Sequence, residues 1–213
     1  IENPDVMPHI ADKSSIRIAY NQAINSLPEV DAVNYSMIDM TGNTNLENLN
    51  MLSEIKSVSS LVIAVNERLK NLKGLEGQSK IDEIRITSNM GLETVEGLNN
   101  LENVCQLYFT ANESLTTLSH LSSLKVIGSN KQYFPVLELK HNNKLTSLGG
   151  LENLKEVNDT HCFITITDNW ELTDFCALRS LLQNPPVESF LASLYGNKYN
   201  PSVSAIKNGN CSQ

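Results

Sequence analysis

The amino-acid sequence predicts a mainly β or α/β repeat solenoid, with about eight rungs that share one parallel sheet. Three observations lead to this prediction. Asparagine recurs at a nearly regular interval, apolar residues alternate just before each of these asparagines, and apolar residues follow at every third position. A change of apolar period from two to three within one repeat is typical of a strand followed by a tight, coiled return.

The recurring asparagines set the register of the repeat. They are separated by 22, 23, 23, 23, 30, 27 and 28 residues. The eight positions are Asn21, Asn43, Asn66, Asn89, Asn112, Asn142, Asn169 and Asn197. An inward amide both donates and accepts hydrogen bonds, so we expect these side chains to satisfy backbone groups where the chain turns after each strand. The alternative is a row of ligand-binding asparagines.

Each asparagine is preceded by apolar residues five and three places earlier. These pairs run from Ile16 and Ile18 in the first unit to Ala192 and Leu194 in the last. Such alternation predicts a short strand with one buried face. Because a single rung cannot bury that face, we expect stacked rungs to share a core, in a stack roughly 35–40 Å long.

The segment after each asparagine predicts an extended or 3₁₀-like coil with one inward side. After Asn89 the apolar residues fall at every third place, at Leu92, Val95, Leu98, Leu101 and Val104. The pattern is weakest after Asn197, where the polar Asn200 replaces leucine. We therefore divide the chain into an N-terminal cap or disordered segment (1–14), seven rungs (15–182), and a capping rung with a tail (183–213).

Composition narrows the classes of partner. The 213 residues carry a formal net charge of −8 and contain no basic run, which argues against nucleic acid and anionic membranes. The chain is 40% hydrophobic but only 6% aromatic, so we expect a mainly aliphatic core. No stretch approaches the roughly 20 apolar residues of a membrane helix. The opening residues read as a mature start, which leaves room for a lipid anchor upstream.

The repeat resembles the receptor L-domain type of leucine-rich repeat. Its unit reads I-x-I-x-x-N-x-x-L-x-x-V-x-G-L-x-x-L, as in IRITSNMGLETVEGLNNL and LELKHNNKLTSLGGLENL. The N-x-x-L spacing, where an ordinary leucine-rich repeat has N-x-L, favours the L-domain type over residues 15–211. The resemblance implies a right-handed superhelix and a place among cell-surface proteins such as those of gut Bacteroidetes. It implies an extracellular or surface location, as in an outer-membrane lipoprotein, and brings no catalytic residues.

The four cysteines fall into two pairs. Cys105 and Cys162 lie in rungs two apart, about 9–10 Å, which is too far for a disulfide, so we expect buried thiols. Cys176 and Cys211 both belong to the C-terminal cap. A disulfide there would pin the tail in an oxidising compartment, and two further thiols are the alternative.

Catalytic and metal-binding motifs are missing from the sequence. The four histidines belong to no HExxH motif, and no GxGxxG or P-loop occurs. His141 and His161 lie near strand ends in neighbouring rungs, and a metal site there would need Asp159 or Asp168 as a third ligand. The alternative is that His141 and His161 are solvated surface residues without a metal. We therefore expect no enzyme activity, no metal and no cofactor.

The outward face of the sheet is the first candidate binding surface. Counting back from the asparagines places aromatic and apolar side chains on the middle and C-terminal rungs, ringed by polar ones. An exposed aromatic patch with a polar rim is typical of a binding surface, although such residues also suit any exposed strand. The candidate residues are Arg85, Tyr108, Val136, Glu138, Lys140, Phe163 and Thr165.

A long interval between Asn112 and Asn142 marks the second candidate. Its extra residues form a loop over 128–135 that contains Tyr133 and Phe134. Insertions in solenoids map to loops on one face and often carry recognition. Covering the edge of the solenoid is the alternative role. Trp170, directly after Asn169, is expected at a surface turn and is a further candidate anchor.

These observations predict a non-catalytic binding module that recognises a protein or carbohydrate through the sheet face and the 128–135 loop. A rigid, broad face lowers the entropy cost of binding. The alternative function is a structural spacer or adhesin segment of a larger cell-surface protein. Homodimerisation through the aromatic patch is a further alternative.

Overall fold

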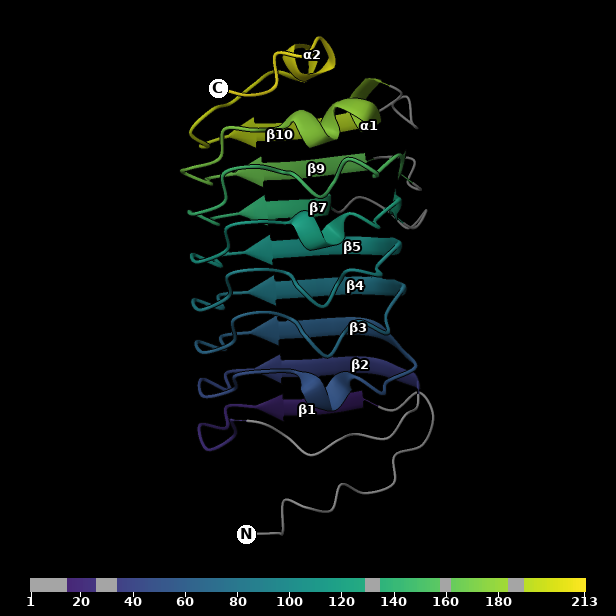
Figure 1. The fold of residues 1–213 in the computed structure, drawn as a ribbon, viewed down its shortest axis with the longest axis vertical. Helices are drawn as coiled ribbons and strands as arrows, with labels where there is room; N and C mark the ends of the chain where they lie inside the picture. The colour runs from purple at the N-terminus through teal and green to yellow at the C-terminus, as the bar shows by residue number, and fades with distance from the viewer. Residues whose placement is uncertain (1–14, 26–33, 129–134, 158–161, 184–189) are drawn as a thin grey trace.

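The computed structural model describes residues 15–25, 34–128, 135–157, 162–183 and 190–213, which form one parallel-sheet β-solenoid. Eight strands follow one another along the stack, one for each rung (Figure 1). They are β1 (Ser15–Ala19), β2 (Asn34–Thr41), β3 (Ser57–Ala64), β4 (Lys80–Thr87), β5 (Asn103–Thr110), β7 (Pro135–Lys140), β9 (Cys162–Thr167) and β10 (Phe190–Tyr195). The predicted solenoid of about eight rungs is thereby confirmed.

The strands pair in the register that the asparagines predict. Residues four places before successive asparagines are direct partners, as in the pairs Val62–Arg85 and Arg85–Tyr108. The whole row runs Arg17, Asp39, Val62, Arg85, Tyr108, Glu138, Thr165 and Ser193. Every pairing along it is parallel, so side chains at equal distances from the asparagines lie in straight rows across the sheet.

The register slips once, in β7. Pro135 pairs with Phe163 and Leu137 pairs with Ile164, which leaves Val136 as an extra residue between them. Val136 is only 2% exposed and belongs to the core. Its predicted place on the outward face is wrong, because the irregularity breaks the simple alternation on which the prediction relied.

The return segments take two forms, and the residue eight places after the asparagine decides between them. Gly74, Gly97 and Gly150 occupy this position with φ near +111 to +117°, a conformation that L side chains rarely adopt. Three rungs that lack this glycine, those of Asn43, Asn112 and Asn169, form 3₁₀ turns instead. These are η1 (Asn50–Leu52), η2 (Ser119–Leu121) and η3 (Cys176–Leu178).

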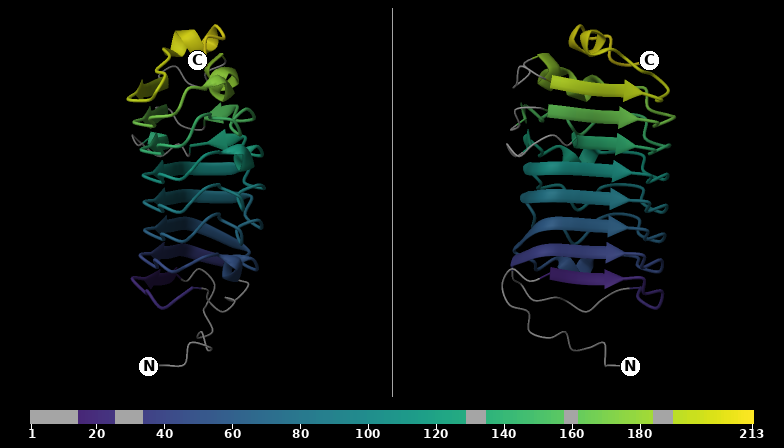
Figure 2. Two further views of the ribbon diagram at one scale, coloured as in Figure 1. Left: turned by 60° about the vertical axis from the view of Figure 1, so that its left-hand side comes forward. Right: turned by 180° about the vertical axis from the view of Figure 1, so that it is seen from behind.

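The strands occupy one side of the stack, and the coiled returns with their short helices occupy the other (Figure 2). Two-residue strands β6 (Val126–Ile127) and β8 (Glu156–Val157) pair with each other, and β6 also pairs with the start of β5. The two α-helices, α1 (Arg179–Gln183) and α2 (Val203–Lys207), belong to the C-terminal end. Among the described residues, no helix has the length and apolar character needed to cross a membrane.

The core between sheet and coil is mainly aliphatic, as the composition predicts. Inward strand residues such as Ile84 and Ile86 and coil leucines such as Leu92 and Leu98 are fully buried in one continuous cluster. Phe109 and Phe175 are among the few aromatic members. Each rung therefore buries its apolar edge only against its neighbours, the arrangement expected of a solenoid.

The asparagines form a hydrogen-bonded ladder along the strand-exit edge. The Nδ2 of Asn89 donates to the carbonyl oxygen of Ile63 at 2.9 Å, and its Oδ1 accepts from the backbone N–H of Asn66 at 3.0 Å. The same pair of contacts repeats along the ladder from Asn43 to Asn197. Because the amides serve buried backbone groups, the structural role predicted for them is confirmed.

The two ends of the ladder differ. Asn21 is exposed instead of inward, since no described rung precedes it, and its Oδ1 accepts from the N–H of Ala23 at 3.0 Å. At the other end, Asn200 takes the place of a ninth rung. Its Oδ1 accepts from the N–H of Asn197 at 2.9 Å, and its Nδ2 donates back to the Asn197 carbonyl at 2.8 Å.

The C-terminal cap is closed by a disulfide between Cys176 and Cys211, whose Cα atoms lie 4.9 Å apart. This confirms the favoured pairing. Cys211 and Ile206 are buried, so the tail covers the end of the core. Cys105, in contrast, is half-buried, and its thiol lies 3.7 Å from the Asp82 carboxylate. The prediction that it is buried is wrong, since it lies on the outer side of β5; the side chain of Cys162 lies outside the described residues.

Candidate binding surfaces

The outward face of the sheet carries most of the predicted site residues. Arg85, Tyr108, Glu138 and Thr165 form consecutive members of one row, and Lys140 follows Glu138 two places along β7. The short helices lie on the opposite side of the stack (Figure 2). This face is therefore left uncovered by any helix of the described chain.

A stacked pair lies at the centre of the face. The Arg85 guanidinium carbon lies 4.3 Å from the centre of the Tyr108 ring, a cation–π arrangement. Its Nε is held by the Glu83 carboxylate, which also accepts from the Ser60 hydroxyl at 3.1 Å. The Arg85 side chain is consequently fixed over the ring and still half-exposed.

The sequence predicts that Tyr108 is exposed, and this prediction is wrong. It is only 6% exposed, because the side chains of the neighbouring strands cover it. Burial is also the main reason that the pKa of the Tyr108 phenol is raised above its ordinary value. The Arg85 charge opposes the rise in pKa, while the Glu83 and Glu138 charges add to it.

The remaining candidates are half-buried. The Glu138 carboxylate accepts from the Thr110 hydroxyl at 3.2 Å, and Lys140, Phe163 and Thr165 lie partly open to solvent. Val136 is excluded, as described above. The sequence predicts an exposed aromatic patch with a polar rim. The structure instead has a polar and charged surface that covers Tyr108. Tyr133 and Phe134 of the predicted loop over 128–135 lie outside the described residues.

Exposed large apolar side chains gather elsewhere, at the strand-exit edge. Six such residues are exposed among those described, and only Met37 lies more than two places from a ladder asparagine. The other five are Tyr20, Val65, Met90, Trp170 and Tyr195. Trp170 is 65% exposed, which confirms its predicted surface position. Tyr195 is not among the candidates predicted from the sequence, although its size departs from the alanines and threonines found at most equivalent positions.

Trp170 lies in the turn after β9, and Tyr195 is the last residue of β10, the strand that pairs with β9. The backbone N–H of Asp168 donates to the Tyr195 carbonyl at 3.0 Å, and that of Asn169 donates to the Asn197 side chain at 3.1 Å. One turn later, Lys198 Nζ and Glu171 Oε2 form an ion pair at 2.6 Å. Two residues with exposed rings therefore belong to neighbouring rungs, and each of these rungs supplies one partner of the ion pair.

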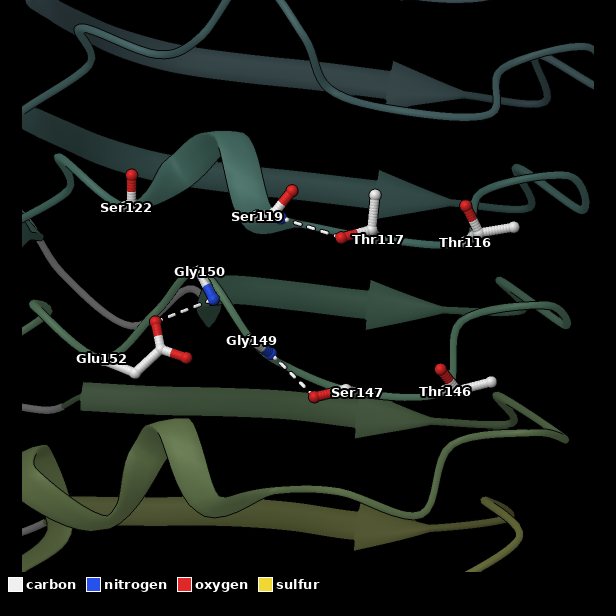
Figure 3. Close-up of a pocket in the computed structure, with 9 residues that line it drawn as sticks. All are labelled: Thr116, Thr117, Ser119, Ser122, Thr146, Ser147, Gly149, Gly150 and Glu152. Atoms are coloured by element: carbon white, nitrogen blue, oxygen red, sulfur yellow. Dashed lines mark hydrogen bonds between the residues drawn. The ribbon is translucent and has the colours of Figure 1, made fainter.

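A shallow hollow of about 540 Å³ opens on the coil side, between the η2 rung and the next one (Figure 3). Its lining is rich in hydroxyl groups and consists of Thr116, Thr117, Ser119, Ser122, Thr146, Ser147, Gly149, Gly150 and Glu152. Several of these groups already serve the turns. Thr117 Oγ1 accepts from the N–H of Ser119 at 3.1 Å, and Ser147 Oγ accepts from that of Gly149 at 3.0 Å.

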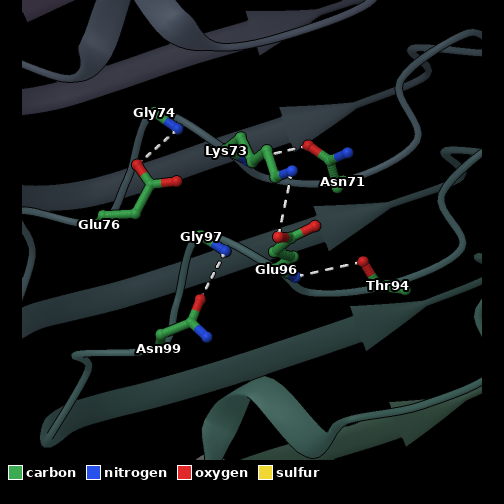
Figure 4. Close-up of polar contacts among 8 residues, drawn as sticks. All are labelled: Asn71, Lys73, Gly74, Glu76, Thr94, Glu96, Gly97 and Asn99. Atoms are coloured by element: carbon green, nitrogen blue, oxygen red, sulfur yellow. Dashed lines mark hydrogen bonds and ion pairs between the residues drawn. The ribbon is translucent and has the colours of Figure 1, made fainter.

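The same turn contacts repeat in other rungs, where no ligand role is needed to explain them (Figure 4). The Asn71 side chain accepts from the N–H of Lys73 at 3.1 Å, and the Glu76 carboxylate accepts from that of Gly74 at 2.8 Å. Lys73 also pairs with Glu96 of the next rung at 3.1 Å. The polar lining of the coil side is thus largely the hydrogen bonding of the repeat itself.

The possible metal ligands do not gather in the described part of the chain. No group of three or more His, Cys, Asp or Glu side chains there is arranged to hold a metal ion. His141 is exposed on its turn, and His161 and Asp159 lie outside the described residues. Comparison of the chain with protein-family models, with curated proteins and with solved structures gave no match.

Proposed function

We propose that this chain is a non-catalytic recognition module that binds a protein partner on the outward face of its sheet. The observation that carries the proposal is the Arg85 guanidinium, which is stacked on a buried tyrosine and held by Glu83 in the middle of that face. Arginine fixed in this way presents its remaining N–H donors without losing side-chain freedom on binding.

The size of the face favours a protein over a small ligand. Eight strands about 4.8 Å apart, with roughly six residues at about 3.3 Å each, give a face of roughly 700 Å². A standard protein–protein interface buries about 800 Å² on each partner. A polymer of carbohydrate is the second candidate, supported by the same flat shape and by the hydroxyl and amide groups of the outer rows.

The repeat supports an assignment to the receptor L-domain type of leucine-rich repeat. The N-x-x-L spacing and the buried asparagine ladder are the features on which this assignment depends. The disulfide between Cys176 and Cys211 supports an oxidising, extracellular or cell-surface location. A structural spacer in a larger surface protein is the competing function.

The test is a binding screen against arrays of extracellular proteins and glycans, in which wild type is compared with Arg85→Ala/Lys140→Ala. The double variant removes two positive side chains of the sheet face. The matched control is Lys70→Ala/Lys125→Ala, which removes two positive side chains that pair with Glu93 and Glu102 on the coil side. We expect a hit that is at least tenfold weaker in the sheet variant and unchanged in the control.

Circular dichroism and thermal melts verify that both variants remain folded. A hit that both variants retain at full strength contradicts a site on the sheet face. A complete lack of hits favours the spacer function.

A further inference from the structure

Trp170 and Tyr195 stand where the repeat requires no large apolar residue. Residues directly after the other ladder asparagines are mostly polar, and those two places before them are mostly alanine and threonine. The positions equivalent to Trp170 hold Gln22, Thr44, Glu67, Met90, Glu113, Asn143 and Lys198. Those equivalent to Tyr195 hold Ala19, Thr41, Ala64, Thr87, Thr110, Lys140 and Thr167. Packing of the rungs therefore does not explain either aromatic residue.

Both departures fall on neighbouring rungs, close to the end of each strand. Trp170 is 65% exposed and Tyr195 is 58% exposed, and their rungs are joined by the backbone hydrogen bond from Asp168 to Tyr195. Leaving two large rings in water is unfavourable, and their hydrophobic surface gains free energy when a partner covers it. Trp and Tyr also offer rigid contact area at a low entropy cost.

Polar groups with fixed positions lie in the same two rungs, within three residues of Trp170 or Tyr195. The Asp168 carboxylate lies against the backbone of Gly196, where a Cβ would overlap it. Lys198 Nζ and Glu171 Oε2 form an ion pair between the two rungs at 2.6 Å. The two rungs thus combine exposed apolar rings with two carboxylates and one ammonium group.

We propose that the stacked turns around Trp170 and Tyr195 form a binding site for a neutral oligosaccharide. A pyranose ring has an apolar face of C–H groups that covers an aromatic ring, and hydroxyl groups at its rim that reach carboxylates and ammonium groups. The excess of negative charge at Asp168 and Glu171 disfavours acidic sugars. Tyr195 lies in the same row as Lys140, two strands further along, but the proposal does not depend on the sheet-face function.

The size of the site argues for one or two sugar rings and against a protein. Two adjacent rungs cover about 10 Å of a stack roughly 35–40 Å long, so they offer only a small part of the roughly 800 Å² that each partner of a stable protein complex buries. The same span matches the length of a disaccharide unit.

Trp170 is the one tryptophan of the chain, so its intrinsic fluorescence reports on this site directly. The experiment titrates the protein with maltohexaose, cellohexaose and mannohexaose up to millimolar concentration, and with polygalacturonate as the acidic comparison. We expect a saturable change in Trp170 fluorescence with at least one neutral hexasaccharide and a weaker response to polygalacturonate.

Three variants locate the binding. Tyr195→Thr introduces the residue found at most neighbouring positions and should weaken affinity at least tenfold. Trp170→Asn introduces the residue of the preceding rung and should abolish the heat of binding in calorimetry. Met90→Thr changes an exposed apolar residue at the position equivalent to Trp170, three rungs away, and should leave affinity unchanged.

The proposal is overturned if no neutral hexasaccharide changes the fluorescence, or if folded Tyr195→Thr binds as tightly as wild type. Arg85→Ala separates this site from the sheet face, because saccharide affinity should be the same as in wild type. A loss of saccharide binding in Arg85→Ala places the sugar on the sheet face and also overturns the proposal.

Discussion

Single residues at the strand exits carry an unusual backbone conformation. The residue directly before every ladder asparagine has a positive φ, between 55° and 74°, from Tyr20 in the first rung to Gly196 in the last. This conformation turns the chain at the end of each strand, and from Asn43 onward the asparagine that follows it is buried. Only two of these eight positions are glycine, so six side chains tolerate a conformation that disfavours them.

Val65 is the least suited of the six, since it is β-branched and has φ of 56°. It is also 40% exposed, so little packing offsets the strain. We expect Val65→Asn to raise the free energy of unfolding by about 1 kcal/mol, because asparagine tolerates the left-handed region better. Urea denaturation measures the change. Gly42→Val, at the equivalent position one rung earlier, should lower stability, and a gain in that variant would contradict the explanation.

Tyr108 gives a prediction about pH. Burial, together with the nearby Glu83 and Glu138 charges, raises the pKa of its phenol. Glu138→Gln removes one of these negative charges and should lower the pKa of the Tyr108 phenol. The pKa is measured by ultraviolet titration of wild type and of Glu138→Gln, each after subtraction of the titration of the same protein carrying Tyr108→Phe. An unchanged or higher pKa in Glu138→Gln would contradict the assigned cause.

The raised pKa also predicts how stability depends on pH. The folded protein holds the phenol proton more tightly than the unfolded chain, whose tyrosines titrate near pH 10. This contribution to stability is therefore complete below about pH 10 and is lost as pH rises through the folded pKa. Tyr108→Phe should show a smaller alkaline loss of stability than wild type.

At the scale of the element, a glycine or a 3₁₀ turn shapes the six returns that follow Asn43, Asn66, Asn89, Asn112, Asn142 and Asn169. A Cβ on Gly150 would overlap the carbonyl of Leu118 in the preceding rung, and the same is true of Gly97 and the carbonyl of Leu72. Gly149 differs, because the nearest atom to a Cβ there is the Ser147 hydroxyl at 3.4 Å. The close approach between rungs thus requires glycine at position 150 but not at position 149.

We expect Gly150→Ala to destabilise the protein by at least about 2 kcal/mol, since it combines an unfavourable φ with a backbone overlap. Gly149→Ala is the matched control and should change stability by less than about 1 kcal/mol. Thermal and urea unfolding of the two variants measure both effects. Equal losses would show that the close approach between rungs is not what requires Gly150.

The repeating elements could be predicted from the sequence because each depends on contacts that recur at fixed spacing. Asn89 and Ile84 occupy the same environment as their counterparts in other rungs, so one pattern describes them all. The burial of Val136 could not be predicted, because the register slip between Pro135 and Leu137 leaves no trace in the apolar pattern of the sequence. Tyr108 could not be recognised as covered, because its burial depends on Arg85, which lies in another strand.

At the scale of the whole molecule, the C-terminal disulfide links residues 35 positions apart and holds the tail over the end of the core. We expect Cys176→Ser/Cys211→Ser to lower the free energy of unfolding by about 2–4 kcal/mol, since the unfolded chain gains freedom. Chemical unfolding with and without reductant measures the effect. Reductant should destabilise wild type and leave the double variant unchanged; equal stability of the two oxidised proteins would contradict the role of the cap.

The asparagine ladder has a mechanical consequence, because each rung is held only by its immediate neighbours. A chain under tension from its N-terminal side would lose rungs one at a time, and each interval of 23 residues would release roughly 80 Å of extended length. Cys176 and Cys211 tie the last segment into a covalent loop that tension cannot extend. Unfolding under tension would therefore proceed in steps from the N-terminal end and stop at the disulfide-closed C-terminal end.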